Sequence, residues 1–237
     1  MDQAAETILV VDDDREIVGA IALALEKEGY QVLRAYNGME ALEQATHPGL
    51  RLILMDVMMP KLDELSAVLR IRERRNLPII VLSAKSEESD KILGLSMGAD
   101  DYVTKPFGMQ ELVARVRSQL RRYTHLGDIH ALPQDGVLVN GRLVYDPTGR
   151  TLTVDGDPVK LTATELGIVD LLMRNPGRIF PAEEIYHRVW GEDAFGSSEN
   201  TVMVHIRRIR EKIELNPREP DYLKVVWGIG YKMEKHN

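Results

Sequence analysis

Polar side chains that together could carry out phosphoryl transfer follow four apolar runs in the first half of the chain. Asp12 and Asp13 follow the first run, Asp56 follows another, Ser83 ends a third, and Lys105 lies in the last. Crowded carboxylates repel one another, and a hard cation such as Mg²⁺, which prefers oxygen ligands, relieves that repulsion. Phosphoryl transfer requires placement and charge neutralisation above all. We therefore expect Asp56 to accept a phosphoryl group, with Ser83 and Lys105 holding its oxygens.

The elements that must position these groups alternate between short β-type runs and segments of helical periodicity. This alternation predicts an α/β fold, a doubly wound five-stranded parallel sheet with helices on both faces. Such sheets bind ligands at the carboxyl ends of their strands, where the polar groups lie. The predicted strands are 8–11, 30–36, 52–55, 78–83 and 101–107, and the predicted helices are 15–29, 38–46, 64–75, 88–98 and 109–123.

Each aspartate could instead cap a helix or face water. For Asp14 we prefer that role, as the N-cap of the first helix. For Asp12, Asp13 and Asp56 we favour the shared site, because three apolar strands end in the groups that one reaction needs.

A change of pattern divides the chain into a first domain at 1–123, a linker at 124–135 and a second domain at 136–237. The linker has no sustained periodicity and contains glycine and proline. Short antiparallel strands follow it, and then a capping box, Thr162 to Glu165, opens the first of three helices. A hairpin with two glycines ends the chain, so an α+β winged helix-turn-helix is predicted.

Composition excludes several classes of protein. The absence of cysteine excludes disulfides, thiolate metal sites and cysteine nucleophiles. No apolar stretch approaches the roughly 18 residues that span a bilayer, and neither end resembles a targeting segment, so we expect a cytoplasmic protein. The net charge of -7 argues against nucleic acid, yet residues 201–213 hold four cations against one anion. Such a local basic stripe is the mark of a DNA contact.

The third helix of the second domain is amphipathic. Its predicted buried stripe is Val202, Ile206, Ile209 and Ile213. The predicted DNA face comprises Thr201, Val204, His205, Arg207, Arg208 and Lys212. We expect Arg208 to contact a guanine edge and Val204 a thymine methyl, because these pairings suit a major groove. Arg207 and Arg210 are expected to meet phosphates, which position the protein.

Several motifs, in order, give the chain a family resemblance. The motifs are VVDDD, MDVMMP, VLSAK, GADDY and TKPF. They resemble those of a flavodoxin-like receiver domain of two-component response regulators, and the second half resembles the DNA-binding domain of the OmpR/PhoB class. The resemblance implies that a sensor histidine kinase phosphorylates Asp56. It also implies that Mg²⁺ is held by Asp13, Asp56 and the backbone carbonyl of Met58 with Asp12 nearby, and that the Lys105–Pro106 bond is cis.

The resemblance further implies a switch and two kinds of partner. The Ser83 hydroxyl moves toward the phosphoryl group, and the Tyr102 ring turns inward. A homodimer forms through the fourth helix, fifth strand and fifth helix, with the pairs Lys91–Glu111, Asp100–Arg117 and Asp101–Arg115. The second domain binds double-stranded promoter DNA, expected as direct repeats, and its loop 191–199 touches RNA polymerase.

Three residues depart from the family pattern. Glu64 stands where glycine is usual, so we expect weaker Mg²⁺ binding or altered loop geometry. Met203 stands where an acidic residue is frequent. Trp227 replaces an arginine that enters the minor groove, and we favour its packing against the recognition helix over a base contact. Lys232 is a further candidate DNA contact on this wing, whose sequence, VWGIGYK, resembles that of regulators of the vancomycin-resistance type.

Three other functions were weighed, and beyond its own phosphorylation and dephosphorylation we expect no enzymatic activity. A dehalogenase-like phosphatase has a second aspartate two residues after the nucleophile, where this chain has Met58. A flavodoxin-like cofactor binder needs a hydroxyl-rich or glycine-rich loop after the first strand. A DNA-binding protein without a switch would use Glu64 as a permanent charge.

Overall fold

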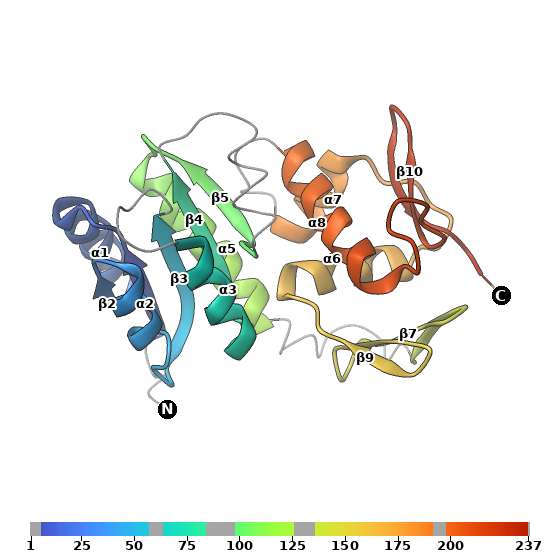
Figure 1. Cartoon of the computed structure of the whole chain (residues 1–237). Helices are drawn as coiled ribbons and strands as arrows, with labels where there is room; N and C mark the ends of the chain where they lie inside the picture. Colours follow the sequence, from blue (N-terminus) through green and yellow to red (C-terminus); the bar gives the residue numbers. More distant parts are fainter. Residues whose placement is uncertain (1–5, 57–63, 84–97, 126–135, 192–197, 237) are drawn as a thin grey trace. The chain divides into compact units, whose positions relative to one another are not determined.

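The computed structural model describes residues 6–56, 64–83, 98–125, 136–191 and 198–236 (Figure 1). The chain forms two compact units, Met1–Leu126 and Gly127–Asn237, here called the first and second units. Within the described ranges, no helix combines the length and apolar character that a membrane crossing requires.

A five-stranded parallel sheet forms the centre of the first unit, as predicted. Its order is β2-β1-β3-β4-β5, so the strands that carry Asp12 and Asp56 are neighbours. The last strand is shorter than predicted and ends before Lys105, whose N–H still donates to the Ser83 carbonyl at 2.7 Å. The strands are β1 Thr7–Val11, β2 Gln31–Ala35, β3 Leu50–Asp56, β4 Ile79–Ser83 and β5 Asp101–Thr104.

Helices cover both faces of this sheet (Figure 1). Alternate strand residues point to opposite faces, so Ile8 and Val10 pack with α1 and α5, whereas Leu9 and Val11 pack with α2 and α3. The predicted helix 88–98 lies almost entirely outside the described residues. The described helices are α1 Arg15–Lys27, α2 Gly38–Gln44, α3 Glu64–Arg74 and α5 Met109–His125. The first two residues of the predicted linker are therefore helical.

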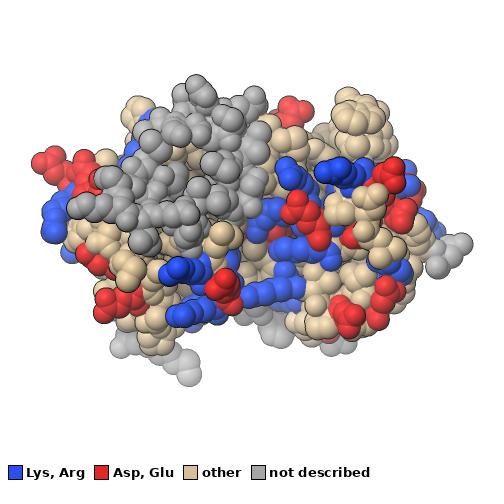
Figure 2. All heavy atoms as spheres, in the orientation of Figure 1, with Lys and Arg blue, Asp and Glu red and all other residues tan. Residues whose placement is uncertain are grey.

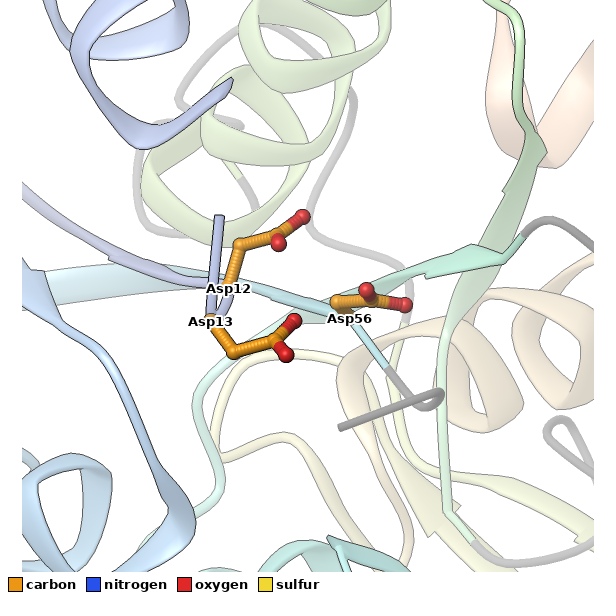
Figure 3. A group of neighbouring side chains, drawn as sticks. All are labelled: Asp12, Asp13 and Asp56. Atoms are coloured by element: carbon orange, nitrogen blue, oxygen red, sulfur yellow. The ribbon is translucent and has the colours of Figure 1, made fainter. Parts of the chain in front are cut away.

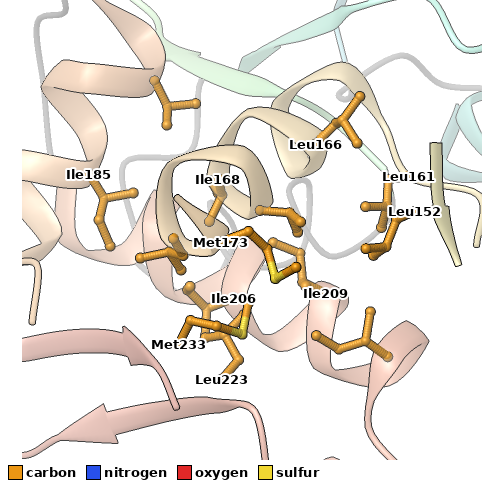
Figure 4. Packing of buried hydrophobic residues seen from close by; sticks show 14 of the residues in the cluster. Leu152, Leu161, Leu166, Ile168, Met173, Ile185, Ile206, Ile209, Leu223 and Met233 are labelled. Carbon is orange, nitrogen blue, oxygen red and sulfur yellow. The ribbon is translucent and has the colours of Figure 1, made fainter. Parts of the chain in front are cut away.

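The second unit combines an antiparallel sheet, three helices and a terminal hairpin. The sheet has the order β6-β7-β8-β9. The helices and the hairpin share one apolar core, in which Ile206 and Ile209 pack beside Leu223 and Met233 (Figure 4). The elements are β6 Leu138–Asn140, β7 Leu143–Asp146, β8 Thr151–Val154, β9 Asp157–Val159, α6 Ala163–Met173, α7 Ala182–Trp190, α8 Ser198–Ile213, β10 Leu223–Val226 and β11 Gly230–Met233.

Both predicted helix starts are confirmed. The Asp14 carboxylate accepts from the backbone N–H groups of Glu16 and Ile17 at the start of α1. Thr162 and Glu165 form a reciprocal capping box at the start of α6. The α6 helix ends at Met173 with Arg174 as its cap, before Gly177.

The hairpin β10–β11 joins the helical core along a short backbone seam. Phe180 and Tyr231 exchange two backbone hydrogen bonds, of 2.8 and 2.9 Å. A Cβ atom at Gly230 would lie 2.1 Å from the Phe180 carbonyl oxygen. Only glycine allows this close backbone approach, and the seam fixes the wing against the segment before α7.

We expect Gly230→Ala to destabilise the second unit by about 3 kcal/mol or more, because rigid backbone atoms would have to move. Gly228→Ala is the matched control, since no atom lies within 4 Å of its added Cβ and only its positive φ of 73° is strained. That strain costs about 1–2 kcal/mol. Urea unfolding followed by fluorescence measures both, because Trp190 and Trp227 lie in the second unit. Equal losses of stability in the two variants would contradict the predicted clash at Gly230.

Candidate phosphoacceptor site and DNA-contact surface

Three carboxylates from two neighbouring strands meet at one edge of the parallel sheet. Asp12 and Asp13 directly follow β1, and Asp56 ends β3. One oxygen from each lies within 4.8 Å of the others, and Figure 3 shows the three side chains pointing into a common space. Asp12 and Asp56 are 1% and 3% exposed, whereas Asp13 is exposed. Two of the three charges are therefore shielded from water.

Lys105 supplies the cation for these buried carboxylates. Its Nζ donates to Asp12 at 2.6 Å and to Asp56 at 2.9 Å. Burial disfavours its charged form, but the two hydrogen bonds outweigh burial and raise the pKa of Lys105. The lysine therefore remains an ammonium ion between two carboxylates. The Lys105–Pro106 peptide bond is cis, as the resemblance implies.

The other predicted site residues lie around this group or outside the described residues. Ser83 ends β4 and is 1% exposed, and Tyr102 on β5 is 8% exposed. Met58 lies outside the described residues, and so does the side chain of Glu64. Asp12 also accepts from the Asp14 backbone N–H at 2.9 Å, which ties the loop after β1 to the start of α1.

The donor set fits a magnesium ion. Carboxylate oxygens are the ligands that Mg²⁺ takes from proteins, and Asp12, Asp13 and Asp56 offer three within reach of one another. A dication among these groups would also relieve the repulsion that one lysine only partly compensates.

The buried stripe of α8 is as predicted, but its opposite face differs. Val202, Ile206, Ile209 and Ile213 all belong to the core of the second unit. The contact of Thr201, Val204 and His205 with DNA stays a prediction, but in the structure these three residues are buried. The cause for His205 is its ring packing 5.3 Å from that of Trp190 in α7. A helical wheel gives one buried stripe, whereas α8 contacts both α6 and α7.

The cations of α8 differ in their surroundings. Arg208 and Lys212 pair with Glu165 at 3.1 and 2.6 Å. Arg210 donates from Nε to the Leu223 carbonyl at 2.7 Å and so ties α8 to β10, and its contact with a phosphate stays a prediction. Arg207 is 73% exposed and pairs with Glu211. Lys and Arg are interspersed with Asp and Glu on the visible face of the second unit (Figure 2).

The wing carries an exposed aromatic residue. Trp227 is 87% exposed, so the prediction that it packs against the recognition helix is wrong. The turn at Gly228 directs it away from the core, and Ile229 beside it is 57% exposed. Lys232 pairs with Glu234 at 2.9 Å.

The two units match two known domain models. Residues 8–117 match the response regulator receiver domain, and residues 156–233 match the C-terminal domain of transcriptional regulatory proteins. Regulatory protein VanR of Enterococcus faecium is 40% identical over 231 residues, which are 98% of this chain and 100% of VanR. This chain belongs to the OmpR/PhoB family of two-component response regulators. It is therefore a transcription factor with a receiver and a DNA-binding domain.

Further comparisons agree with this family. Sensory transduction protein RegX3 of Mycobacterium tuberculosis is 37% identical over 228 residues, covering 96% of this chain and 99% of RegX3. A solved structure of a RitR mutant has a TM-score of 0.75 at 24% identity, covering 98% of this chain and 100% of that one. This second likeness shows the shared fold.

Five of the six charged residues predicted to pair across a response-regulator dimer have partners within one chain. Asp101 pairs with Arg115 at 3.1 Å, and Arg115 also binds Glu111 at 3.0 Å. Asp100 pairs with Arg72 of α3 and accepts from the Ile79 N–H at 3.0 Å. Arg117 pairs with Glu28 of α1. The predicted Asp100–Arg117 contact would thus require both residues to exchange partners. Lys91 lies outside the described residues.

Sequence reasoning missed three structural ion pairs, which are Arg72–Asp100, Arg208–Glu165 and Lys212–Glu165. Arg72 of α3 pairs with Asp100, which directly precedes β5. Its Nε also donates to the Gly98 carbonyl at 2.9 Å. Glu165 was recognised only as a capping residue, although it also binds two cations of α8. A capping box accepts glutamine as well as glutamate at this position. The presence of a charged residue was therefore a signal that Glu165 has charged partners.

We expect Lys105→Met to destabilise the first unit by about 3 kcal/mol at neutral pH, because two buried carboxylates lose their cation. Millimolar Mg²⁺ should recover part of this loss. The control is Lys27→Met at the exposed end of α1. Urea unfolding followed by circular dichroism measures the change. A Lys105→Met variant as stable as the control, without Mg²⁺, would contradict the role of the ammonium group.

Proposed function

We propose that phosphorylation of Asp56 by a sensor histidine kinase switches the binding of promoter DNA by this regulator. The observation that supports it best is the Lys105 ammonium group between Asp12 and Asp56. A carboxylate oxygen of Asp56 attacks the phosphorus of a phosphohistidine. The new O–P bond forms as the P–N bond breaks, and the imidazole keeps the electron pair and takes up a proton.

The neighbouring groups have distinct roles in this proposal. Lys105 turns toward the phosphoryl oxygens as a compact point charge, and the Ser83 hydroxyl donates to another oxygen. Mg²⁺ held by Asp12, Asp13, Asp56 and the Met58 carbonyl supplies neutralisation of phosphate charge. Tyr102, two residues from the end of β5, turns its ring inward when Asp56 is phosphorylated and so changes the conformation of that strand. The chain acts only on its own phosphoryl group and not as an enzyme on other substrates.

The proposed output is binding to double-stranded promoter DNA, arranged as direct repeats. Residues 1–123 receive the signal, residues 124–135 link the domains and residues 136–237 bind DNA. The α8 helix enters the major groove with Arg208 at a base edge, and Arg207 meets a phosphate. Trp227 and Lys232 on the wing lie along the neighbouring backbone. The protein acts in the cytoplasm, and its segment 191–199 contacts RNA polymerase.

Dimerisation through the predicted fourth helix (88–98), β5 and α5 completes the proposal. A two-fold interface must be self-complementary, and β5 and α5 contain both signs of charge in Asp101, Glu111 and Arg115. The ion pairs seen within one chain would be shared with, or exchanged for, those of a second copy. Arg117 and Glu111 offer most for such an exchange, because their side chains are 63% and 35% exposed.

The experiment compares DNA affinity and molecular mass with and without beryllofluoride and Mg²⁺, which together mimic the phosphoryl group. The duplexes are chosen by selecting bound fragments from genomic DNA. We expect the mimic to produce dimers and to tighten binding about tenfold or more, with no effect on Asp56→Asn. Unchanged affinity and mass would contradict the switch and favour a permanently active DNA-binding protein.

A further inference from the structure

A single buried carboxylate connects two helices of the second unit. Glu165 lies in the first turn of α6 and is 0% exposed. One oxygen accepts from the Thr162 backbone N–H at 2.8 Å and from Lys212 at 2.6 Å. The other lies 3.1 Å from the guanidinium group of Arg208. The same side chain therefore caps α6 and binds two cations on α8, 43 and 47 residues further along the chain.

This contact sets the charge that α8 presents. Burial disfavours the carboxylate charge, but Arg208 and Lys212 outweigh burial and lower the pKa of Glu165. The carboxylate is thus ionised, and one negative charge is shared by two positive ones. Arg208 and Lys212 are 12% and 30% exposed, so both are held close to the protein.

Arg207 on the same helix provides the contrast. Its pair with Glu211 is an exposed pair one helical turn apart, with 73% and 50% of the side chains exposed. Exposed pairs of this kind contribute about 0–1 kcal/mol and leave the side chain free to rearrange. On α8, therefore, Arg208 and Lys212 are held by a buried anion, whereas Arg207 is solvated.

We infer that Glu165 is a positioning residue that sets DNA specificity by holding Arg208 and Lys212. It directs the guanidinium group of Arg208 and withholds the charge of Lys212 from phosphates. Phosphate contacts tighten binding to any sequence, whereas base contacts discriminate. Glu165 therefore raises the ratio of the affinities for right and wrong sequences by directing Arg208, and it weakens binding to every sequence by withholding Lys212. This inference rests on the proposed contact of α8 with DNA.

The test is Glu165→Gln in the full-length protein with beryllofluoride and Mg²⁺. Glutamine keeps an oxygen that can accept from Thr162 in the capping box but removes the charge. Binding is measured to a duplex selected from genomic DNA and to a scrambled duplex of equal composition, each over a series of salt concentrations. We expect the ratio of the two affinities to fall about tenfold, the size of one lost base contact. For the scrambled duplex the slope of log K against log salt should steepen by about 0.9.

Two controls separate positioning from a structural effect. Glu211→Gln removes an exposed carboxylate from the same helix and should leave the ratio of affinities unchanged. A merely structural role for Glu165 would lower both affinities equally and leave the salt slope unchanged, which would overturn the inference. Adding Lys212→Met to Glu165→Gln should return the slope to its original value, because Lys212 supplies the added phosphate contact.

A second pair of variants tests the same inference if Glu165→Gln fails to fold. Arg207→Met should make the slope for the scrambled duplex shallower by about 0.9, whereas Lys212→Met should change it by less than half as much. Equal changes of the salt slope in the two variants would show that Glu165 does not keep the charge of Lys212 from the phosphates. If the wild-type protein did not prefer the selected duplex over the scrambled one, that result would instead contradict the proposed DNA binding.

Discussion

One ammonium group between two buried carboxylates is the interaction on which the first unit depends. Lys105 can reach Asp12 and Asp56 only because β1 and β3 are parallel neighbours and β5 ends at the same edge of the sheet. One cation cannot compensate all three carboxylates, and a phosphoryl group would change the balance again. Any change of charge at Asp56 must therefore alter the electrostatic interactions of Lys105, and through Lys105 it must affect the end of β5.

The second unit contains the opposite arrangement. There, one buried carboxylate, Glu165, compensates two cations of α8. Both clusters are charged beyond what their own partners neutralise, the first with excess negative charge and the second with excess positive charge. A metal ion suits the first and a phosphate backbone suits the second. The charges of the two clusters thus agree with the proposal that one unit accepts a phosphoryl group and the other binds DNA.

The sequence predicts best what depends on local pattern and on strand ends. The parallel sheet, the cap at Asp14 and the meeting of Asp12, Asp13 and Asp56 were all predictable, because strand periodicity and parallel topology fix where those groups lie. The surroundings of α8 were not, because a helical wheel cannot show that His205 packs on Trp190 or that Arg208 meets Glu165. The exposure of Trp227 was not predicted for a similar reason. An aromatic residue suggests packing, but this one lies beside the glycine turn of the hairpin, away from the core. The partner of Asp100 also required tertiary structure, since Arg72 lies in α3, 28 residues earlier in the chain.

The central claim is that these converging groups make Asp56 the phosphoacceptor. It is tested most directly by incubating the full chain with acetyl phosphate and Mg²⁺, trapping the acyl phosphate with borohydride and mapping the product by mass spectrometry. The account predicts a single modified carboxylate, at residue 56, that is absent when Mg²⁺ is chelated. Modification at another aspartate, or none at all in a folded protein supplied with Mg²⁺, would contradict it.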